Sequence, residues 1–566
     1  MMLNEKTNNN RWKLYSFLLI LLSVVLNLKR WGSFPSFIDI YYHLSVAEGF
    51  NKAGGYAVQS FWEFAPIGRL HVYPPFIHTV ILLFYKLKLP LLLIARLIEF
   101  TIFPILLFTI WYVIKKVFYE RLAFFSVLAA ISTYAFYLSV STLIPASLAL
   151  IFGLAALLAI EKNKAVSASL LLCLSLYSQA GVSWFICLAL FIYGFLNRTK
   201  FKICLISLVS ALLLTLPLFV HQFRALEYVD LRGIRENLYL EINILIYLTA
   251  AAGIFFSLRK KGSYCFFIAL LIAMVPFLGY YKYRYICGQG MIGLILLSAL
   301  TLDTFYQKAA QKAAKNPAGK GALYTYFTAT LFLFLIFSPT IYHFQRQTGF
   351  LGVNSTYANF LKAHKRMKLP ATSCRVSSGI RHSQEPAYAK ASTGSPPFIP
   401  MASHGVFWRR RIIRPNETSI HFPKSWKKAS DIIRENFAEG DIIYSNQPYI
   451  AGVVSVYSGH ATSTAMLSEI GPLEEFDALG NSKIIVWFKR PDNKPDEKLT
   501  LLIKKHGLEP VGETDILYIF KNPRSSAKET IKKAFLPAWF MFFILFAIIA
   551  VIIRDLKSNK NIIYQK

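Results

Sequence analysis

The chain has 566 residues, of which 55% are apolar and 16% are charged, and its mean hydropathy is +0.43. Soluble proteins carry about 25% charged residues, so this composition excludes an ordinary soluble chain and indicates a membrane protein. The formal net charge is +32, from 62 basic and 30 acidic residues. Much of the excess lies in short breaks between apolar segments, as the positive-inside rule predicts for cytoplasmic loops. We therefore predict no nucleic-acid partner.

Twelve apolar segments carry few or no charges, and we predict that each crosses the membrane as a helix. They are 13–28, 89–114, 121–138, 147–160, 165–178, 182–196, 203–220, 240–257, 263–280, 287–303, 323–341 and 535–553. The first follows Arg11, but no small-residue cleavage pattern comes after it. We therefore expect an uncleaved span rather than a signal peptide.

A thirteenth apolar stretch, 72–89, could either cross the membrane or remain outside it. If it does not cross, every basic break from Lys115 to the C-terminal tail lies on the same side as the N-terminus. If it crosses, those breaks move to the opposite side. Because the positive-inside rule applies to such short loops, we predict a non-crossing helix at 72–89. Residues 29–88 and 342–534 are then extracytoplasmic.

The second of these outer regions is long enough to be a domain. Its latter half alternates strand-like runs, such as 483–488, with helix-like runs, such as 498–506, whereas 342–424 reads as irregular. This alternation predicts an α/β domain. The expected fold is a polytopic all-α transmembrane bundle of about 12 to 13 spans with an extracytoplasmic α/β domain near the C-terminus. Its expected parts are a transmembrane domain at 1–341 with the first outer loop at 29–88, the α/β domain at 342–534, and a final span with a cytoplasmic tail at 535–566.

The first outer loop is dense in acids, histidines and aromatic residues. Residues 38–50 read IDIYYHLSVAEGF, and residues 61–75 read FWEFAPIGRLHVYPP. Asp39 follows the first span closely, at the membrane surface, where an acid can accept a proton or hold a cation. On a helix that begins near Asp39, His43 lies one turn further along the same face. The alternative for Asp39 is a helix cap or a solvated acid.

This loop resembles the opening of GT-C glycosyltransferases, in which an acid followed by an aromatic pair stands in the first outer loop. Oligosaccharyltransferase catalytic subunits and their archaeal counterparts are the most similar, and protein O-mannosyltransferases and aminoarabinose transferases are more distant. Gly68-Arg69 and Tyr73-Pro74 resemble the end of that loop. The architecture of residues 10–340 is similar, while the motif evidence lies within 36–76. The resemblance implies a polyprenyl-phosphate or polyprenyl-diphosphate sugar donor, an inverting transfer, and Asp39 as catalytic base or metal ligand.

Two departures from the oligosaccharyltransferase pattern affect the expected chemistry. The next outer loop, 139–147, contains no Asp or Glu, and the WWDYG acceptor motif is missing. A single acid fits the monosaccharide transferases better, where one aspartate acts as base without an obligatory metal. A divalent cation, Mg or Mn, at Asp39 stays open as the cofactor, with its second ligand unknown.

Six further residues are candidates for substrate binding. They are His43, Glu63, Arg69 and His71 in the first outer loop, and Lys282 and Arg284 after the span at 263–280. The resemblance implies a basic residue near 284 that holds the lipid phosphate, and an arginine can do so with two parallel hydrogen bonds. The alternatives are packing for the histidines, a solvated acid for Glu63, and an aromatic belt with exposed cations for 280–285.

We therefore expect an integral-membrane glycosyltransferase that moves a sugar from a polyprenyl-phosphate-linked donor to an acceptor on the outer face, with inversion. One alternative is a protein-glycosylating enzyme that resembles oligosaccharyltransferases and uses a lipid-diphosphate-linked oligosaccharide. Alternatives of another class are a membrane transporter and a polysaccharide ligase. The expected partners are the lipid-linked donor, membrane lipids and a lipid, glycan or protein acceptor. The expected location is the plasma membrane, as a multi-pass protein with its site facing outward.

Overall fold

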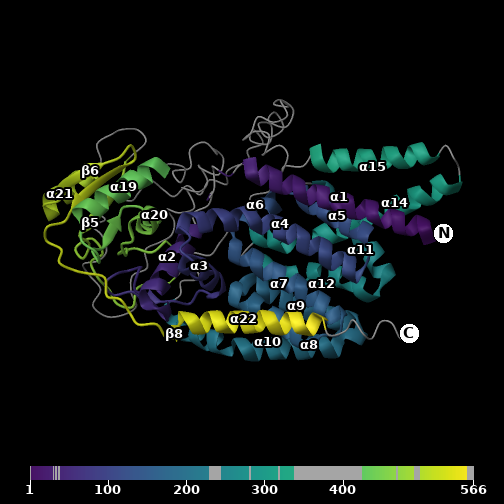
Figure 1. Ribbon diagram of the computed structural model, residues 1–566, viewed down its shortest axis with the longest axis horizontal. Helices are drawn as coiled ribbons and strands as arrows, with labels where there is room; N and C mark the ends of the chain where they lie inside the picture. Colours follow the sequence, from purple (N-terminus) through teal and green to yellow (C-terminus); the bar gives the residue numbers. More distant parts are fainter. Residues whose placement is uncertain are drawn as a thin grey trace, which may run out of the picture.

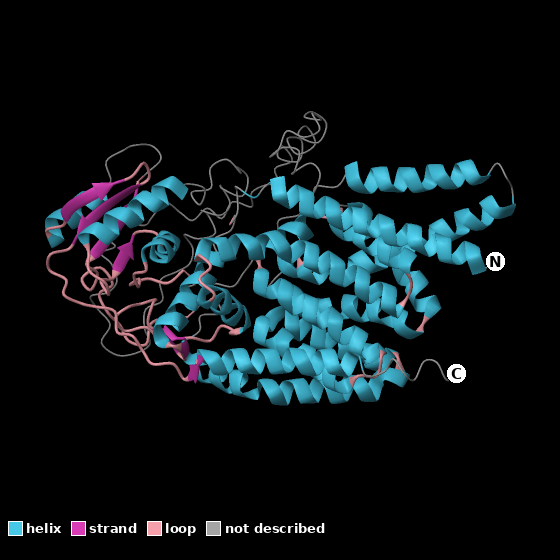
Figure 2. Ribbon diagram, viewed as in Figure 1, coloured by secondary structure: helices cyan, strands magenta, loops and turns pink. Residues whose placement is uncertain are grey.

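The computed structural model describes residues 2–29, 31, 35, 39–228, 244–279, 282–315, 319–336, 423–466, 470–489 and 497–557. The described chain is mostly helical (Figure 2). A long helical bundle carries an α/β domain at one end, and residues 2 and 557, the first and last that the structure describes, lie toward the other end (Figure 1). Of the stretch 342–424, predicted to be irregular, residues 342–422 lie outside the described residues, and residues 423 and 424 begin a helix.

Each predicted apolar span coincides with one or more helices. These are α1 (Met2–Lys29), α4 (Leu91–Val117), α5 (Glu120–Ile131) with α6 (Tyr134–Thr142), α7 (Ile144–Glu161), α8 (Ala165–Ser178), α9 (Ala180–Leu196), α10 (Arg198–Arg224), α11 (Ile244–Lys260), α12 (Cys265–Met274), α14 (Ile292–Lys315), α15 (Gly319–Ile336) and α22 (Ala538–Lys557). Within the described part of the chain, seven helices are long and apolar enough to cross a membrane, or eight if α5 and α6, bent by 83°, form one span. Some of the rest are shorter, such as α8 with 14 residues, or about 21 Å. The structure thus supports a multi-pass bundle, and twelve crossings remain a prediction.

The bundle is held together by close helix packing around one large apolar core. The contact between α11 and α14 depends on Gly253, because a Cβ atom there would stand 2.1 Å from the carbonyl oxygen of Leu297. Small residues of this kind let membrane helices approach closely and gain van der Waals contact.

The basic breaks between the helices gather at the end of the bundle that is remote from the α/β domain. Polar contacts join them to one another: Arg121 with Asp303, Lys200 with Glu161, Ser263 with Glu161, and Ser167 with Asp555. The rings of Phe118 and Tyr264, 4.6 Å apart, connect the two halves of this set. The basic breaks, which are spread along the sequence, therefore lie together at one end of the fold.

The helix predicted at 72–89 is α3 (Phe76–Lys86), which packs against α2 (Asp39–Ala53) and α4. It has 11 residues and is about 16 Å long, roughly half the thickness of a hydrocarbon core. Its length therefore agrees with a helix that does not cross.

The α/β domain contains a four-stranded sheet of order β4-β5-β7-β6. Its strands are β4 (Ile443–Ser445), β5 (Ile484–Phe488), β6 (Glu509–Glu513) and β7 (Leu517–Lys521), and its helices are α19 (Pro423–Asn436), α20 (Pro448–Ser458) and α21 (Glu497–His506). The β4–β5 pair is parallel, and the other pairs are antiparallel. Among the described residues, the predicted runs at 441–445, 483–488 and 516–520 coincide with strands.

The domain and the membrane bundle share an apolar core. Ile40, Tyr41 and Leu44 of α2 belong to the same buried cluster as Val454 of α20 and Ile484 of β5. The first outer loop and the last span are also joined, because β1 (Gly55–Tyr56) pairs antiparallel with β8 (Leu536–Pro537), just before α22. The first outer loop is therefore enclosed between the bundle, the α/β domain and the last span.

Candidate active site

Asp39 is the first residue of α2, as the sequence predicts, and it is half-buried. An acid in the first turn stabilises a helix, because the N-terminal end carries a partial positive charge from unpaired amides. The next residues, from Ile40 to Ala47, are all buried. Helix α2 is thus packed along most of its length, while its leading carboxylate remains partly open.

The beginning of α2 lies beside the first turns of α4, where the second span starts. Arg96 and Glu99 of α4 are close enough to Tyr41 to influence its hydroxyl electrostatically. Arg96 lies about 8 Å along α4 from its first residue. The first turn of α2, to which Asp39 belongs, therefore lies beside the start of α4 and next to the α/β domain.

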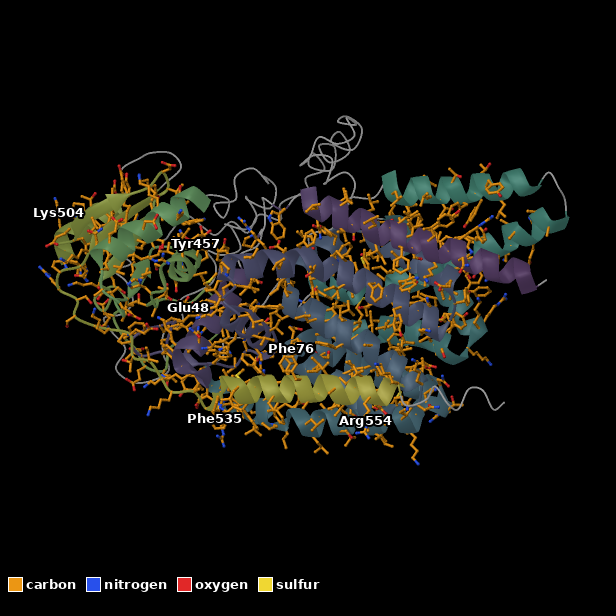
Figure 3. The ribbon with its side chains drawn as sticks, in the orientation of Figure 1. Glu48, Phe76, Tyr457, Lys504, Phe535 and Arg554 are labelled. Carbon is orange, nitrogen blue, oxygen red and sulfur yellow. The ribbon has the colours of Figure 1, made fainter. Side chains whose placement is uncertain are left out.

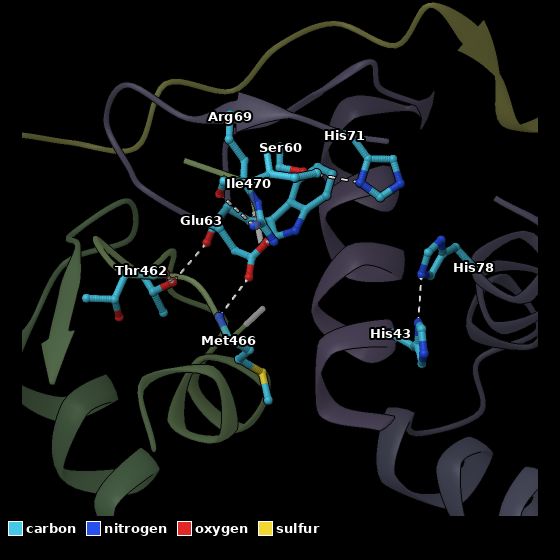
Figure 4. Close-up of polar contacts among 11 residues, drawn as sticks. His43, Ser60, Glu63, Arg69, His71, His78, Thr462, Met466 and Ile470 are labelled. Carbon is cyan, nitrogen blue, oxygen red and sulfur yellow. Dashed lines mark hydrogen bonds and ion pairs between the residues drawn. The ribbon is translucent and has the colours of Figure 1, made fainter. Parts of the chain in front are cut away.

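Two of the predicted histidines, His43 and His71, lie in a buried aromatic cluster with a third, His78 of α3 (Figure 4). Nδ1 of His43 and Nε2 of His78 are hydrogen-bonded at 2.9 Å, and Nδ1 of His71 contacts the Ser60 hydroxyl at 3.2 Å. Burial lowers the pKa of His43 and of His71 to about 3, and it lowers the pKa of His78 well below its usual value. These rings are neutral at physiological pH. They can therefore form hydrogen bonds, but they cannot attract a negatively charged substrate.

Glu63 and Arg69 form a buried ion pair at 2.6 Å, with about 3–4% of each side chain exposed. Glu63 also accepts a hydrogen bond from the backbone amide of Met466, and Arg69 donates to the carbonyl of Ile470 (Figure 4). The pair thus ties the first outer loop to the α/β domain. Their predicted part in substrate binding stays a prediction, and their contacts favour a structural role.

Arg284 lies on α13 (Lys282–Ile286) and is half-buried. The following turn, η6 (Gln289–Met291), is bonded to the second outer loop, because the side chain of Gln289 contacts the hydroxyl and the carbonyl of Ser139, each at 2.9 Å. Helix contacts run from η6 to α6, from α6 to α4 and from α4 to α2. Arg284 is therefore linked to α2 through two intervening helices, and its predicted part in binding the lipid phosphate stays a prediction. The side chain of Lys282 lies outside the described residues.

In the described part of the chain, no three His, Cys, Asp or Glu side chains form a group that could hold a metal ion. Asp39 is thus not part of such a group there. A Mg ion can be held by one or two carboxylates together with waters and substrate phosphates, so a divalent cation at Asp39 stays a prediction, and we derive no step through one.

Two residues that contact α2 were not predicted from the sequence. His78 of α3 is hydrogen-bonded to His43 and lies 35 residues from it along the chain. Tyr457 of α20 stacks on Tyr41, with ring centroids 6.5 Å apart. Neither residue belongs to a motif, so only their contacts identify them.

The sequence matches no protein-family model and no curated protein. Its fold does match solved structures. The archaeal oligosaccharyltransferase AglB from Archaeoglobus fulgidus, in complex with an inhibitory peptide and a dolichol-phosphate, is 12% identical with a TM-score of 0.50, over 84% of this chain and 69% of that one. The chain has the GT-C fold. The resemblance predicted from the first outer loop is thereby confirmed at the level of fold.

Two other structures with the GT-C fold are similar to a lesser degree. The apo form of the A. fulgidus oligosaccharyltransferase is 12% identical with a TM-score of 0.46, over 80% of this chain and 64% of that one. ArnT from Cupriavidus metallidurans, in the apo state, is 13% identical with a TM-score of 0.46, over 87% and 94%. The chain thus spans less than two thirds of the apo oligosaccharyltransferase. Its chemistry has to be argued from its own residues.

Proposed function

We propose that the protein is an integral-membrane glycosyltransferase that moves a sugar from a polyprenyl-phosphate-linked donor to an acceptor, with inversion, on the outer face of the membrane. The observation that carries the proposal is the position of Asp39 in a GT-C fold. Its carboxylate begins α2 beside the start of α4, next to the α/β domain. A donor anchored in the bilayer and an acceptor in water can both reach this position.

In the proposed mechanism, Asp39 acts as general base. It takes the proton of an acceptor hydroxyl, whose oxygen forms a bond to the anomeric carbon from the side opposite the lipid phosphate. The bond between that carbon and the phosphate oxygen breaks, and the polyprenyl phosphate leaves with the electron pair. Arg284 would stabilise the negative charge that grows on the departing phosphate.

Two observations support the donor and the face. The A. fulgidus enzyme with TM-score 0.50 was solved with a dolichol-phosphate, which is a lipid phosphate of the proposed kind. The basic breaks gather at the end remote from Asp39, and the positive-inside rule assigns that end to the cytoplasm. The plasma membrane is the proposed location.

A peptide acceptor is the second candidate, because that same neighbour was solved with an inhibitory peptide. The missing WWDYG motif argues against it, since Trp426 and Trp487 are separate buried core residues here. A hydroxyl acceptor on a lipid or glycan is therefore preferred.

The proposal is tested by measuring sugar transfer from radiolabelled polyprenyl-phosphate donors in membranes that contain the wild type or Asp39→Asn. We expect the variant to lose at least about a hundredfold in rate, the usual contribution of a general base. Glu497→Gln is the matched control, because Glu497 is also the first residue of a helix, α21, but lies in the α/β domain. Asp39→Asn activity within about threefold of wild type, a barrier change of ~0.7 kcal/mol, would exclude Asp39 as the base.

A further inference from the structure

One stripe of α2 faces the α/β domain and begins two residues after Asp39. It consists of Tyr41, Leu44, Glu48 and Lys52, which share a helix face. Both ends of the stripe meet the last turn of α20. The ammonium of Lys52 donates to the carbonyl of Gly459 at 2.9 Å, and the ring of Tyr41 stacks on that of Tyr457 with an interplanar angle of 24°. Tyr457 and Glu48 both lie at this junction (Figure 3).

Tyr457 is fixed within its own domain. Its backbone carbonyl accepts hydrogen bonds from the Ser430 hydroxyl at 2.7 Å and from the Arg434 guanidinium at 2.6 Å, both on α19. Helix α20 ends immediately afterwards, at Gly459, whose φ of +83° is readily adopted only by glycine. Tyr457 is therefore a fixed point on the domain surface.

Tyr41 is fully buried, and the polar groups that act on its hydroxyl include Tyr457, Glu99 and Arg96. Burial raises the pKa of Tyr41, and the hydroxyl of Tyr457 and the charge of Glu99 raise it further, so the phenol keeps its proton at neutral pH. Arg96 acts electrostatically on both tyrosine hydroxyls. A buried hydroxyl is costly without polar partners, so these neighbours stabilise one orientation of Tyr41.

The first turn of a helix is its least constrained part, because its amides have no partners within the helix. Asp39 and Tyr41 both belong to this turn of α2. We propose that Tyr457 is a positioning residue that acts through Tyr41 to hold the first turn of α2, and with it the carboxylate of Asp39, in the reactive geometry. The inference rests on the proposed function for its catalytic consequence. It makes the α/β domain part of the active site, although the base itself belongs to the membrane domain.

The structural part is tested by amide hydrogen exchange on the purified full-length protein. Tyr457→Phe keeps the stacked ring and removes the hydroxyl. Within 39–44, the amides of His43 and Leu44 report on the first turn, because they donate to the carbonyls of Asp39 and Ile40. We expect exchange at these amides to accelerate about threefold or more, and exchange in peptides that cover 48–53 to stay unchanged. Tyr518→Phe, at a partly exposed tyrosine of β7 in the same domain, is the control and should change neither. Unchanged exchange at 39–44 in Tyr457→Phe would overturn the inference, whether or not the protein transfers sugar.

The catalytic part is tested by kinetics. We expect Tyr457→Phe and Tyr41→Phe each to lower kcat about threefold to tenfold with KM for the donor unchanged. The double variant should lose no more than either single variant, because both act through one contact. Additive losses, or a loss explained by less folded protein, would reduce Tyr457 to a packing residue. Absence of transfer by the wild type itself would reject the proposed function, while the exchange result still decides the coupling.

Discussion

The three buried histidines make the first outer loop sensitive to acid. In the folded protein the pKa of His43 and of His71 is about 3, against about 6.5 in the unfolded chain. Between these two pKa values the folded state binds fewer protons than the unfolded chain. The two histidines therefore cost no unfolding free energy well above pH 6.5, and they lower it progressively as the pH falls below 6.5. At pH 5 each of the two should cost about 2 kcal/mol of unfolding free energy.

The corresponding measurement is the melting temperature of the purified protein at pH 7.5 and pH 5. His43→Gln should be less stable than wild type at pH 7.5, because it disrupts the bond to His78, yet lose less on acidification. His506→Gln, at the end of α21, is the comparison: partial burial also lowers the pKa of His506, but less than that of the fully buried His43, so this variant should change the pH dependence less than His43→Gln does. An equal drop in melting temperature for His43→Gln and wild type would contradict the assignment.

Glu63 and Arg69, two residues of the first outer loop, have contacts that favour a structural role over substrate binding. Glu63→Gln leaves the guanidinium of Arg69 buried without its counter-charge, and breaking a buried pair in this way costs about 3–5 kcal/mol. We expect a lower melting temperature in Glu63→Gln, with kcat and KM unchanged for the protein that remains folded. A higher donor KM at unchanged stability would instead support the predicted role in substrate binding.

At the scale of elements, the sequence predicted what depends on local pattern. The start of α2 was predictable because an acid precedes a buried aromatic run, and β5 because its apolar residues are contiguous. Helix α20 was not predicted, since the β-branched residues Val453, Val454 and Val456 favour a strand and only packing on α2 and α19 makes them helical. Strand β6 was missed because Pro510 and Gly512 interrupt it, which an edge strand tolerates.

The β1–β8 pair is a small element with a large effect, because it joins the first outer loop to the last span. A Cβ atom at Gly55 would stand 2.1 Å from the carbonyl oxygen of Leu536, which is backbone and cannot give way easily. Gly55→Ala should therefore destabilise the protein by about 1–3 kcal/mol and increase proteolysis between residues 530 and 538. Gly279→Ala, where a Cβ atom meets nothing within 4 Å, is the control. Equal protease resistance in the two variants would show that the pair is dispensable.

At the scale of the whole molecule, the candidate site combines segments that are far apart in the sequence. Asp39 could be singled out from the first outer loop alone. The residues that act on Tyr41, in the same turn of α2, could not, because Tyr457 comes from a domain more than 400 residues away and Arg96 from a different helix, α4. Contacts across such separations depend on how the domain docks, and no local pattern encodes that.

The topology predicted from charge parity can be tested on the intact molecule. If α3 stays on the outer side, the α/β domain and Asp39 face outward together, and every basic break faces the cytoplasm. If α3 crossed, the domain would be cytoplasmic and could not meet an acceptor held above Asp39. Single cysteines are placed at Lys504, an exposed residue of α21 (Figure 3), and at Lys312, an exposed residue near the end of α14, in a chain without other cysteines. A membrane-impermeant thiol reagent added to intact cells should modify the cysteine at 504 and leave the one at 312 unmodified until the membrane is opened. The reverse pattern would overturn the topology, and with it the proposed outward-facing site.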